Sequence, residues 1–207
     1  MAPPTAYPAS LAIDYPNREL NRLTTFFRLF AVIPIAIILG LVSGSTVPVE
    51  GDKYLFGTGG VVFLATALML VFRQKYPRWW FDWNLGVTRF GTRVSAYMAL
   101  LRDEYPATDD EQAVHVAIAY PDAARGLNRW LPLVKWILAV PHYVVLCILG
   151  IAACFCIIFA WFAILFTGRY PRSAFDFVVG VMRWSLRVSA YAFLLTTDRY
   201  PPFSVAP

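Results

Sequence analysis

The chain contains two copies of one long sequence pattern, and this duplication limits its fold more than any other feature. Residues 75–97 read KYPRWWFDWNLGVTRFGTRVSAY, and residues 169–191 read RYPRSAFDFVVGVMRWSLRVSAY. A repeat of this length predicts two copies of one structural unit. We therefore expect a first unit at residues 1–106 and a second unit at residues 107–207.

Shorter matches extend the duplication toward the start of each unit. Leu-Asn-Arg occurs at residues 20–22 and again at residues 127–129, and Arg28 corresponds to Lys135. Tyr-Pro pairs mark the segment boundaries, because proline disfavours helix at the residue before it and tyrosine favours a membrane–water interface. Each unit is expected to contain an extended stretch, an apolar hairpin and a long final helix.

Long stretches without charged residues predict that the chain lies in a membrane. Residues 29–49 and 54–72 contain no acidic or basic residue, and residues 136–168 contain none except His142. Charged residues make up 15% of the chain, well below the quarter that is usual in soluble domains. Since about 20 apolar residues cross a bilayer, we expect an all-α integral membrane protein.

The apolar segments and the repeated motif predict the positions of the helices. A single helix over residues 131–167 would be about 55 Å long, too long for a bilayer core of about 30 Å, so a tight hairpin turn is expected near Gly150. The expected transmembrane helices are residues 26–44 and 55–72 in the first unit and 131–149 and 151–167 in the second, and the expected amphipathic interfacial helices are residues 79–101 and 173–195.

A small sheet is expected beside the helices. Residues 114–118 read Val-His-Val-Ala-Ile, in which apolar and other residues alternate as they do in a half-buried strand. The matching lead-in of the first unit, residues 10–14, is its natural partner. We predict that the two segments pair on the cytoplasmic side.

The distribution of basic residues predicts the topology. If the N-terminus and the Tyr-Pro segments face the cytoplasm, and residues 43–53 form an outer hairpin tip, then only Lys53 of the 18 lysines and arginines lies outside. This is the positive-inside rule, and it places both termini in the cytoplasm. The absence of a signal-peptide pattern in the first residues favours the same side for the N-terminus. The alternative is a transporter-like inverted repeat with six crossings, which would move several basic residues outside.

A narrow charged stripe runs along each long helix. Lipid does not solvate charges, so these residues must face a partner, and we expect each aspartate to pair with an arginine of the other unit. The same arginines also suit an anionic lipid headgroup or another phosphate, and a conduction path is a third reading. The candidates are Asp82, Arg89 and Arg93 in the first unit and Asp176, Arg183 and Arg187 in the second, with Arg78 and Arg172 of the Tyr-Pro-Arg motifs.

His142 is an ionisable residue inside a predicted membrane segment, and the first unit has Ile35 at the same place. It is either a functional group or a neutral side chain that hydrogen-bonds a carbonyl freed by the neighbouring proline. The cysteines are expected to be reduced packing residues, because Cys147, Cys154 and Cys156 share one apolar segment without other metal ligands. The sequence contains no recognisable catalytic, phosphate-loop or metal-binding motif.

The duplicated Tyr-Pro-Arg-x-x-Phe-Asp-x-x-x-Gly-Val-x-Arg-x-x-x-Arg-Val-x-Ala-Tyr pattern, with Val-Pro-His-Tyr at residues 140–143 and Asp-Arg-Tyr-Pro-Pro-Phe at residues 198–203, resembles the bacterial membrane-protein family known as domain of unknown function 4389. The resemblance covers nearly the whole chain. It implies a multi-pass protein of a bacterial inner membrane and no assigned activity or catalytic residues.

These observations predict a non-enzymatic inner-membrane protein that scaffolds or accompanies a membrane complex and binds anionic lipid. Its expected partners are membrane lipids, other membrane-protein subunits or a second copy of itself, and no cofactor is expected beyond a bound phospholipid. Nucleic acid is not an expected partner, because the basic residues follow the predicted inner interface. A transporter or channel for a small solute, lipid or ion remains the alternative.

Overall fold

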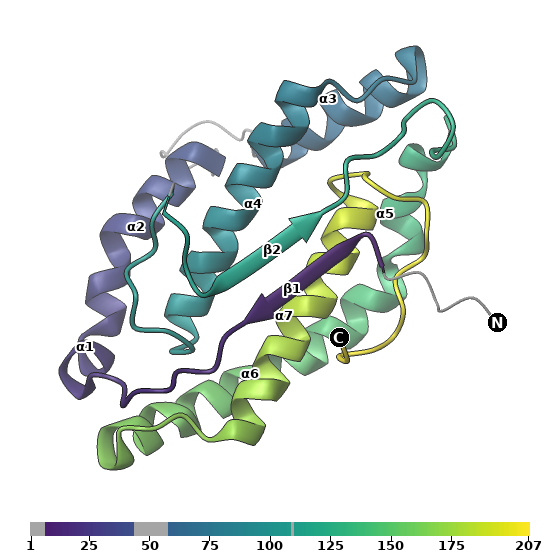
Figure 1. Ribbon diagram of the computed structural model, residues 1–207. Coiled ribbons are helices and arrows are strands. Elements are labelled where there is room, and N and C mark those ends of the chain that lie inside the picture. The colour runs from purple at the N-terminus through teal and green to yellow at the C-terminus, as the bar shows by residue number, and fades with distance from the viewer. Residues whose placement is uncertain (1–6, 44–57, 109) are drawn as a thin grey trace, which may run out of the picture.

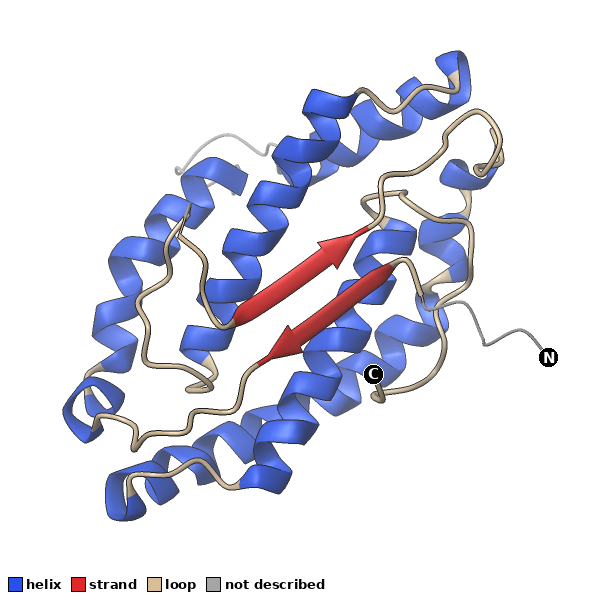
Figure 2. Cartoon of the chain, in the orientation of Figure 1, coloured by secondary structure: helices blue, strands red, loops and turns tan. Residues whose placement is uncertain are grey.

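Two strands, one near the start of the sequence and one near its middle, pair at the front of the molecule (Figure 1). The computed structural model describes residues 7–43, 58–108 and 110–207. Strands β1 (Ala9–Ile13) and β2 (Val114–Ile118) form a two-stranded antiparallel sheet with Leu11 opposite Val116 (Figure 2). Alternate residues of each strand are buried, and the others are exposed. The predicted pairing of the two lead-in segments is confirmed.

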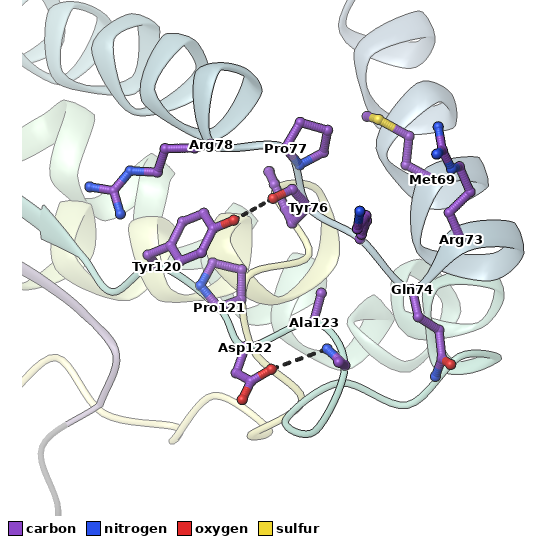
Figure 3. Close-up of a pocket in the computed structure, with 12 residues that line it drawn as sticks. Met69, Arg73, Gln74, Tyr76, Pro77, Arg78, Tyr120, Pro121, Asp122 and Ala123 are labelled. Atoms are coloured by element: carbon purple, nitrogen blue, oxygen red, sulfur yellow. Dashed lines mark hydrogen bonds between the residues drawn. The ribbon is translucent and has the colours of Figure 1, made fainter.

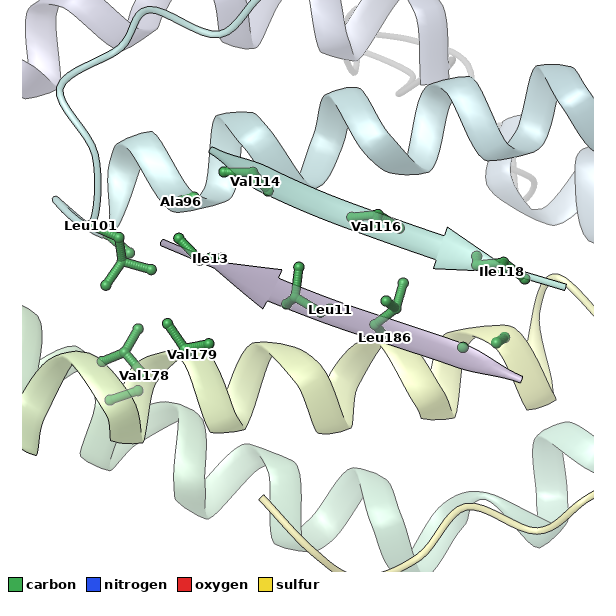
Figure 4. Close-up of a cluster of buried hydrophobic side chains, with 14 of the residues drawn as sticks. Leu11, Ile13, Ala96, Leu101, Val114, Val116, Ile118, Val178, Val179 and Leu186 are labelled. Carbon is green, nitrogen blue, oxygen red and sulfur yellow. The ribbon is translucent and has the colours of Figure 1, made fainter. Parts of the chain in front are cut away.

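Each strand lies on a long helix of the other half of the chain. Strand β1 packs on α7 (Arg172–Ala192), and β2 packs on α4 (Arg78–Met98) (Figure 1). Between the sheet and these helices lies a core of aliphatic side chains that includes Leu11, Val116 and Leu186 (Figure 4). The two halves therefore share one core.

The remaining helices flank this centre. Helix α2 (Arg28–Ser43) packs on α4, and α6 (Val140–Thr167) packs on α7. The short helices also contact the other half of the chain. Helix α1 (Arg22–Phe26) contacts α6, and the 3-10 helix η1 (Leu131–Leu133) contacts α3 (Thr58–Arg73). Helix α5 (Lys135–Leu138) joins η1 to α6.

Proline and glycine set the helix boundaries that the repeated motif marks. Helices α4 and α7 begin directly after Pro77 and Pro171, whose fixed φ suits a helix start. Helix α6 ends at Gly168, which adopts the left-handed conformation at φ 74° while its N–H bonds to the carbonyl of Ile164.

Helix α6 presents a continuous apolar face that no described part of the chain covers. Its exposed side chains recur every three or four residues, so they share one side of the helix. Phe26 of α1 stacks on Trp161 of α6, at a ring-centroid distance of 6.2 Å, and extends the face sideways. The exposed large side chains of α6 include Val144, Ile148, Ile151, Phe155, Phe159, Phe162 and Phe166.

The prediction of an all-α membrane protein with a transmembrane hairpin in each unit is wrong. The protein has a sheet, and within residues 7–43, 58–108 and 110–207 only α6 is long and apolar enough to cross a membrane. The apolar segments Phe30–Gly40 and Phe63–Arg73 are shorter than a bilayer span. The six-crossing alternative fails for the same reason.

The predicted hairpin turn at Gly150 is also wrong. Residues 131–138 form η1 and α5, and α6 then runs through Gly150 without a break. A glycine lowers helix propensity but keeps the backbone hydrogen bond, and no turn residues accompany it here. Because the long helix begins only at Val140, it is about 42 Å long, not the 55 Å from which the turn was argued.

The other predicted helices agree with α2, α3, α4 and α7 to within a few residues. The predicted outer tip at residues 43–53 falls almost wholly on residues 44–57, which lie outside the described residues. The placement of α4 and α7 at a membrane interface and the division into two units remain predictions.

Candidate functional site

Two buried ion pairs occupy matching positions in the two halves. The guanidinium of Arg28 pairs with Asp103, and both side chains are less than a tenth exposed. Lys135 Nζ lies 2.6 Å from Asp198, and the lysine side chain has no exposed surface. Burial lowers the pKa of Lys135, while the hydrogen bond and the charge of Asp198 oppose that change.

The same groups tie the chain that follows each long helix to the first residues of α2 and α5. Lys135 Nζ also donates to the carbonyl of Thr197 at 2.7 Å and lies 5.3 Å from the ring centre of Tyr191. Arg28 donates to the carbonyl of Arg102, also at 2.7 Å, and lies 4.0 Å from the ring centre of Tyr97. Each pair therefore joins one half's helix start to the end of its long helix.

The predicted arginines of the stripe bind strand carbonyls. Arg89 Nε donates to the carbonyl of Val116 at 3.2 Å, and Arg183 Nε donates to that of Leu11 at 3.0 Å. Leu11 and Val116 are opposite each other in the sheet. They form a non-hydrogen-bonded pair, because the backbone bonds between the strands are made by the residues on either side of them. Their own backbone N–H and C=O groups therefore point to the outer edges of the sheet. Each arginine thus satisfies an edge carbonyl of the strand from the other half.

The second arginine of each stripe binds a loop. Arg93 donates to the carbonyl of Ala107 at 2.7 Å, and Arg187, with 5% of its surface exposed, donates to that of Ser204 at 3.4 Å. Burial lowers the pKa of Arg187, and the neighbouring charge of Arg183 adds to this effect. These arginines hold the backbone around the sheet.

The predicted pairing of each aspartate with an arginine of the other unit is wrong. Asp82 lies 3.3 Å from Arg78, and Asp176 lies 3.6 Å from Arg172, one turn away on the same helix and exposed. The strand between the helices provides carbonyl oxygens within reach of the other arginines, so those charges need no carboxylate.

His142 is fully buried in an aromatic cluster. Its Nδ1 accepts a hydrogen bond from the indole N–H of Trp184 at 3.1 Å, and its ring stacks on Phe203 at 4.0 Å. The predicted carbonyl partner is therefore wrong, and Trp184 takes that place. Nε2 of His142 has no hydrogen-bond partner among the described residues.

Two open pockets lie at the turns that precede α4 and α7. The first junction pocket, about 720 Å³, is bounded by Tyr76, Arg78 and Tyr120, and the Tyr120 hydroxyl donates to the carbonyl of Tyr76 at 2.5 Å (Figure 3). The second junction pocket, about 450 Å³, is bounded by the matching Tyr170, Arg172 and Tyr15. The hydroxyl of Tyr15 likewise donates to the carbonyl of Tyr170, at 2.5 Å.

A groove of about 580 Å³ separates α4 from α7. Its walls carry hydroxyl groups of Thr88, Thr92 and Ser95, each of which donates to a carbonyl of its own helix. Across the described residues, no group of three histidine, cysteine or acidic side chains could hold a metal ion.

Sequence reasoning missed the two buried ion pairs. The signal was present, since Arg28 and Lys135 match across the duplication and an aspartate stands two residues before a Tyr-Pro pair at Asp103 and Asp198. Sequence reasoning also missed the junction pockets as cavities, although it named Arg78 and Arg172, which line them, as candidates for binding an anion.

Residues 130–204 match the family model described as Domain of unknown function (DUF4389). This segment covers η1, α5, α6 and α7, and the match confirms the resemblance for these residues but not for the first half of the chain. No curated protein and no solved structure matches the chain.

Proposed function

We propose that this chain, whose residues 130–204 belong to the DUF4389 family, is a non-enzymatic protein that lies along a membrane and scaffolds or accompanies a membrane complex. The observation that carries the proposal is the uncovered apolar face of α6. At half exposure each aromatic or aliphatic side chain of this size offers on the order of 100 Å². The face then exceeds the 300–600 Å² that is usual for the largest apolar patch of a soluble monomer.

The neighbours of α6 favour an orientation in the plane of the membrane. Helix α7 packs along α6 and carries β1, so a crossing α6 would bring the sheet to the same depth. Asp14, which follows β1, is exposed beside the sheet and lies 3.3 Å from the exposed His115 of β2. Each charge in the bilayer centre would cost roughly 2.5–3.5 kcal/mol. An arrangement in which α6 lies on the lipid and the sheet faces water avoids the cost of burying these charges.

Charge and aromatic residues support the same contact. The net charge of +5 favours an anionic leaflet. Exposed indole rings, which prefer the boundary between lipid and water, occur at Trp79, Trp130 and Trp136. The non-enzymatic part of the proposal rests on the sequence, in which no catalytic pattern occurs.

Vesicle flotation tests the proposal. The protein is expected to float with neutral phosphatidylcholine vesicles, and Phe155→Ser with Phe162→Ser is expected to reduce the bound fraction at least tenfold, since each buried phenylalanine contributes about 1.5–3 kcal/mol. As a matched control, Ala12→Ser with Ala117→Ser adds hydroxyls to the exposed sheet face and should leave flotation unchanged. A wild-type protein that stays with the soluble fraction would refute membrane association.

Copurification tests the scaffold role. A second membrane protein, or a second copy of this chain, is expected to remain bound when the protein is extracted in mild detergent, and a solitary monodisperse chain would contradict it. No observation favours the transport alternative, because it depended on crossings by helices that are either too short, as α2 and α3 are, or not apolar enough, as α4 and α7 are.

A further inference from the structure

The two junction pockets carry the same kind of charge at opposite ends of the molecule. Each is lined by three basic side chains and one acidic side chain. The basic residues are Arg73, Lys75 and Arg78 in the first pocket and Arg18, Arg169 and Arg172 in the second. The recurrence of this composition at matching turns of a duplicated chain indicates two equivalent sites.

Most of the positive charge in the first junction pocket is available to a ligand. Within the described residues, neither Arg73 nor Lys75 forms an ion pair, and Arg78 is shared with the exposed Asp82. The guanidinium carbon of Arg78 lies over the ring of Tyr120, 4.8 Å from the ring centre. The acidic residue of the pocket, Asp122, accepts hydrogen bonds from two backbone N–H groups at 3.2 Å.

The second junction pocket repeats these contacts. Arg172 lies 4.5 Å from the ring centre of Tyr15 and is shared with the exposed Asp176. Arg169 is 4.0 Å from Glu19, at the limit of an ion pair, and both side chains are mostly exposed. Arg18 pairs with no carboxylate in the described part of the chain. A dianionic or monoanionic group could therefore meet several cations in either pocket.

The position of the pockets matches the depth of lipid phosphates. Each pocket lies where an apolar helix, α3 or α6, ends and an amphipathic helix begins. Lipid phosphates occupy the corresponding border between acyl chains and water, and basic side chains at that border attract anionic headgroups. Both volumes lie within the range of small-ligand sites.

We propose that each junction pocket binds the phosphate group of an anionic ligand and that one chain binds two such ligands. In each pocket an arginine lies over a tyrosine ring, and the planar fork of N–H donors on a guanidinium group suits phosphate oxygens. The inference rests on the proposed function in one respect, because membrane association makes a lipid headgroup the source of the phosphate. A soluble phosphate ester carries the same group.

Native mass spectrometry of the detergent-solubilised full chain, titrated with phosphatidylglycerol, counts the ligands. The wild type is expected to retain two lipids. Arg73→Gln with Lys75→Gln and, separately, Arg18→Gln with Arg169→Gln should each leave one, with the affinity of the altered pocket about 30-fold weaker, from roughly fivefold per basic residue. The four changes together should leave none.

The control removes the same charge elsewhere. Arg22→Gln with Arg125→Gln neutralises two exposed arginines that line neither pocket and should still bind two lipids. If this control loses as many bound lipids as the pocket variants do, or if the wild type binds no lipid, the two-pocket assignment is overturned. The altered side chains are exposed, and unchanged circular-dichroism melting verifies that each variant is folded.

Two further readouts separate the possible explanations. Millimolar glycerol phosphate should fail to displace phosphatidylglycerol; displacement would refute the lipid source and make a soluble phosphate the ligand of the same pockets. Flotation of the pocket variants with phosphatidylcholine vesicles should equal that of the wild type. If the wild type floats but does not bind phosphatidylglycerol through these pockets, the two-pocket proposal is refuted and membrane association is not. If the wild type does not float, membrane association is refuted and phosphate binding in the pockets is not.

Discussion

Lys135 is a charged residue without exposed surface, held by three groups that come from the end of its own half. Asp198 supplies the opposite charge, Thr197 a carbonyl and Tyr191 a ring face. Asp198 also accepts the backbone N–H of Asn128 at 2.5 Å. The lysine, the aspartate and two backbone segments form one connected network, so the loss of one member affects the others.

Asp198→Asn is expected to destabilise the protein by about 3–5 kcal/mol, because it leaves the Lys135 ammonium buried without a counter-charge. The matched change Asp176→Asn removes an exposed partner of Arg172 and should cost at most about 1 kcal/mol. Denaturant unfolding in one detergent measures both free energies of unfolding. Equal effects would show that burial does not raise the importance of the Lys135 pair.

The partners of the stripe arginines could not be deduced from the sequence. Helical periodicity shows that Arg89 and Arg183 share a face with an aspartate, but it does not show which group lies opposite. The partners are the backbone carbonyls of Val116 and Leu11, and a backbone carbonyl leaves no mark in the residue pattern. The ion pairs of Arg28 and Lys135, in contrast, could be found by comparing the two copies.

At the scale of elements, Gly150 tests whether α6 is one helix. A Cβ added at Gly150 would meet no atom within 4 Å, and alanine is favoured over glycine in a helix interior by about 0.5–1 kcal/mol. Gly150→Ala is therefore expected to stabilise the protein by that amount. A hairpin turn at this position would give the opposite sign.

Gly180 provides the contrast for this substitution. A Cβ there would lie 2.9 Å from the Val205 carbonyl oxygen and from its Cβ, so Gly180→Ala should destabilise the protein by about 1–3 kcal/mol. Thermal unfolding of the two variants beside the wild type checks both signs. If both were destabilising, the continuous α6 would be in question.

The strands could be predicted from alternation alone, because one buried face leaves the same pattern in any small sheet. The helix hairpin was wrongly predicted because the argument used the length of an apolar stretch without locating its helix start. Pro132 and Pro141 lie in that stretch, and the chain there forms a 3-10 turn and a short helix before α6 begins. Helix α6 is still about 42 Å long, more than a bilayer core of about 30 Å, so the length argument holds only for a helix that crosses the membrane upright.

At the scale of the whole molecule, duplication predicted two units but not how they meet. Each strand buries the same alternate residues whether it lies on its own long helix or on the other one. The pattern therefore cannot distinguish the two arrangements. Counting basic residues on each side could not do so either, because that count assumes that the helices cross a membrane.

The second half alone, residues 107–207, is expected to form a symmetric dimer in detergent. In the intact chain β2 packs on α4, and α7 is covered by β1, so an isolated half would lack both partners, and a second copy would supply them. Sedimentation equilibrium of this fragment should give twice its monomer mass. A folded monomer whose strand lies on its own α7 would contradict the expectation.

Each half lends its strand to the long helix of the other half, so neither half has its observed packing without the other. Their linkage in one polypeptide fixes a one-to-one ratio of the halves. It also lets them differ in sequence, and His142, which stands where the first half has Ile35, is a difference that a dimer of identical chains could not hold.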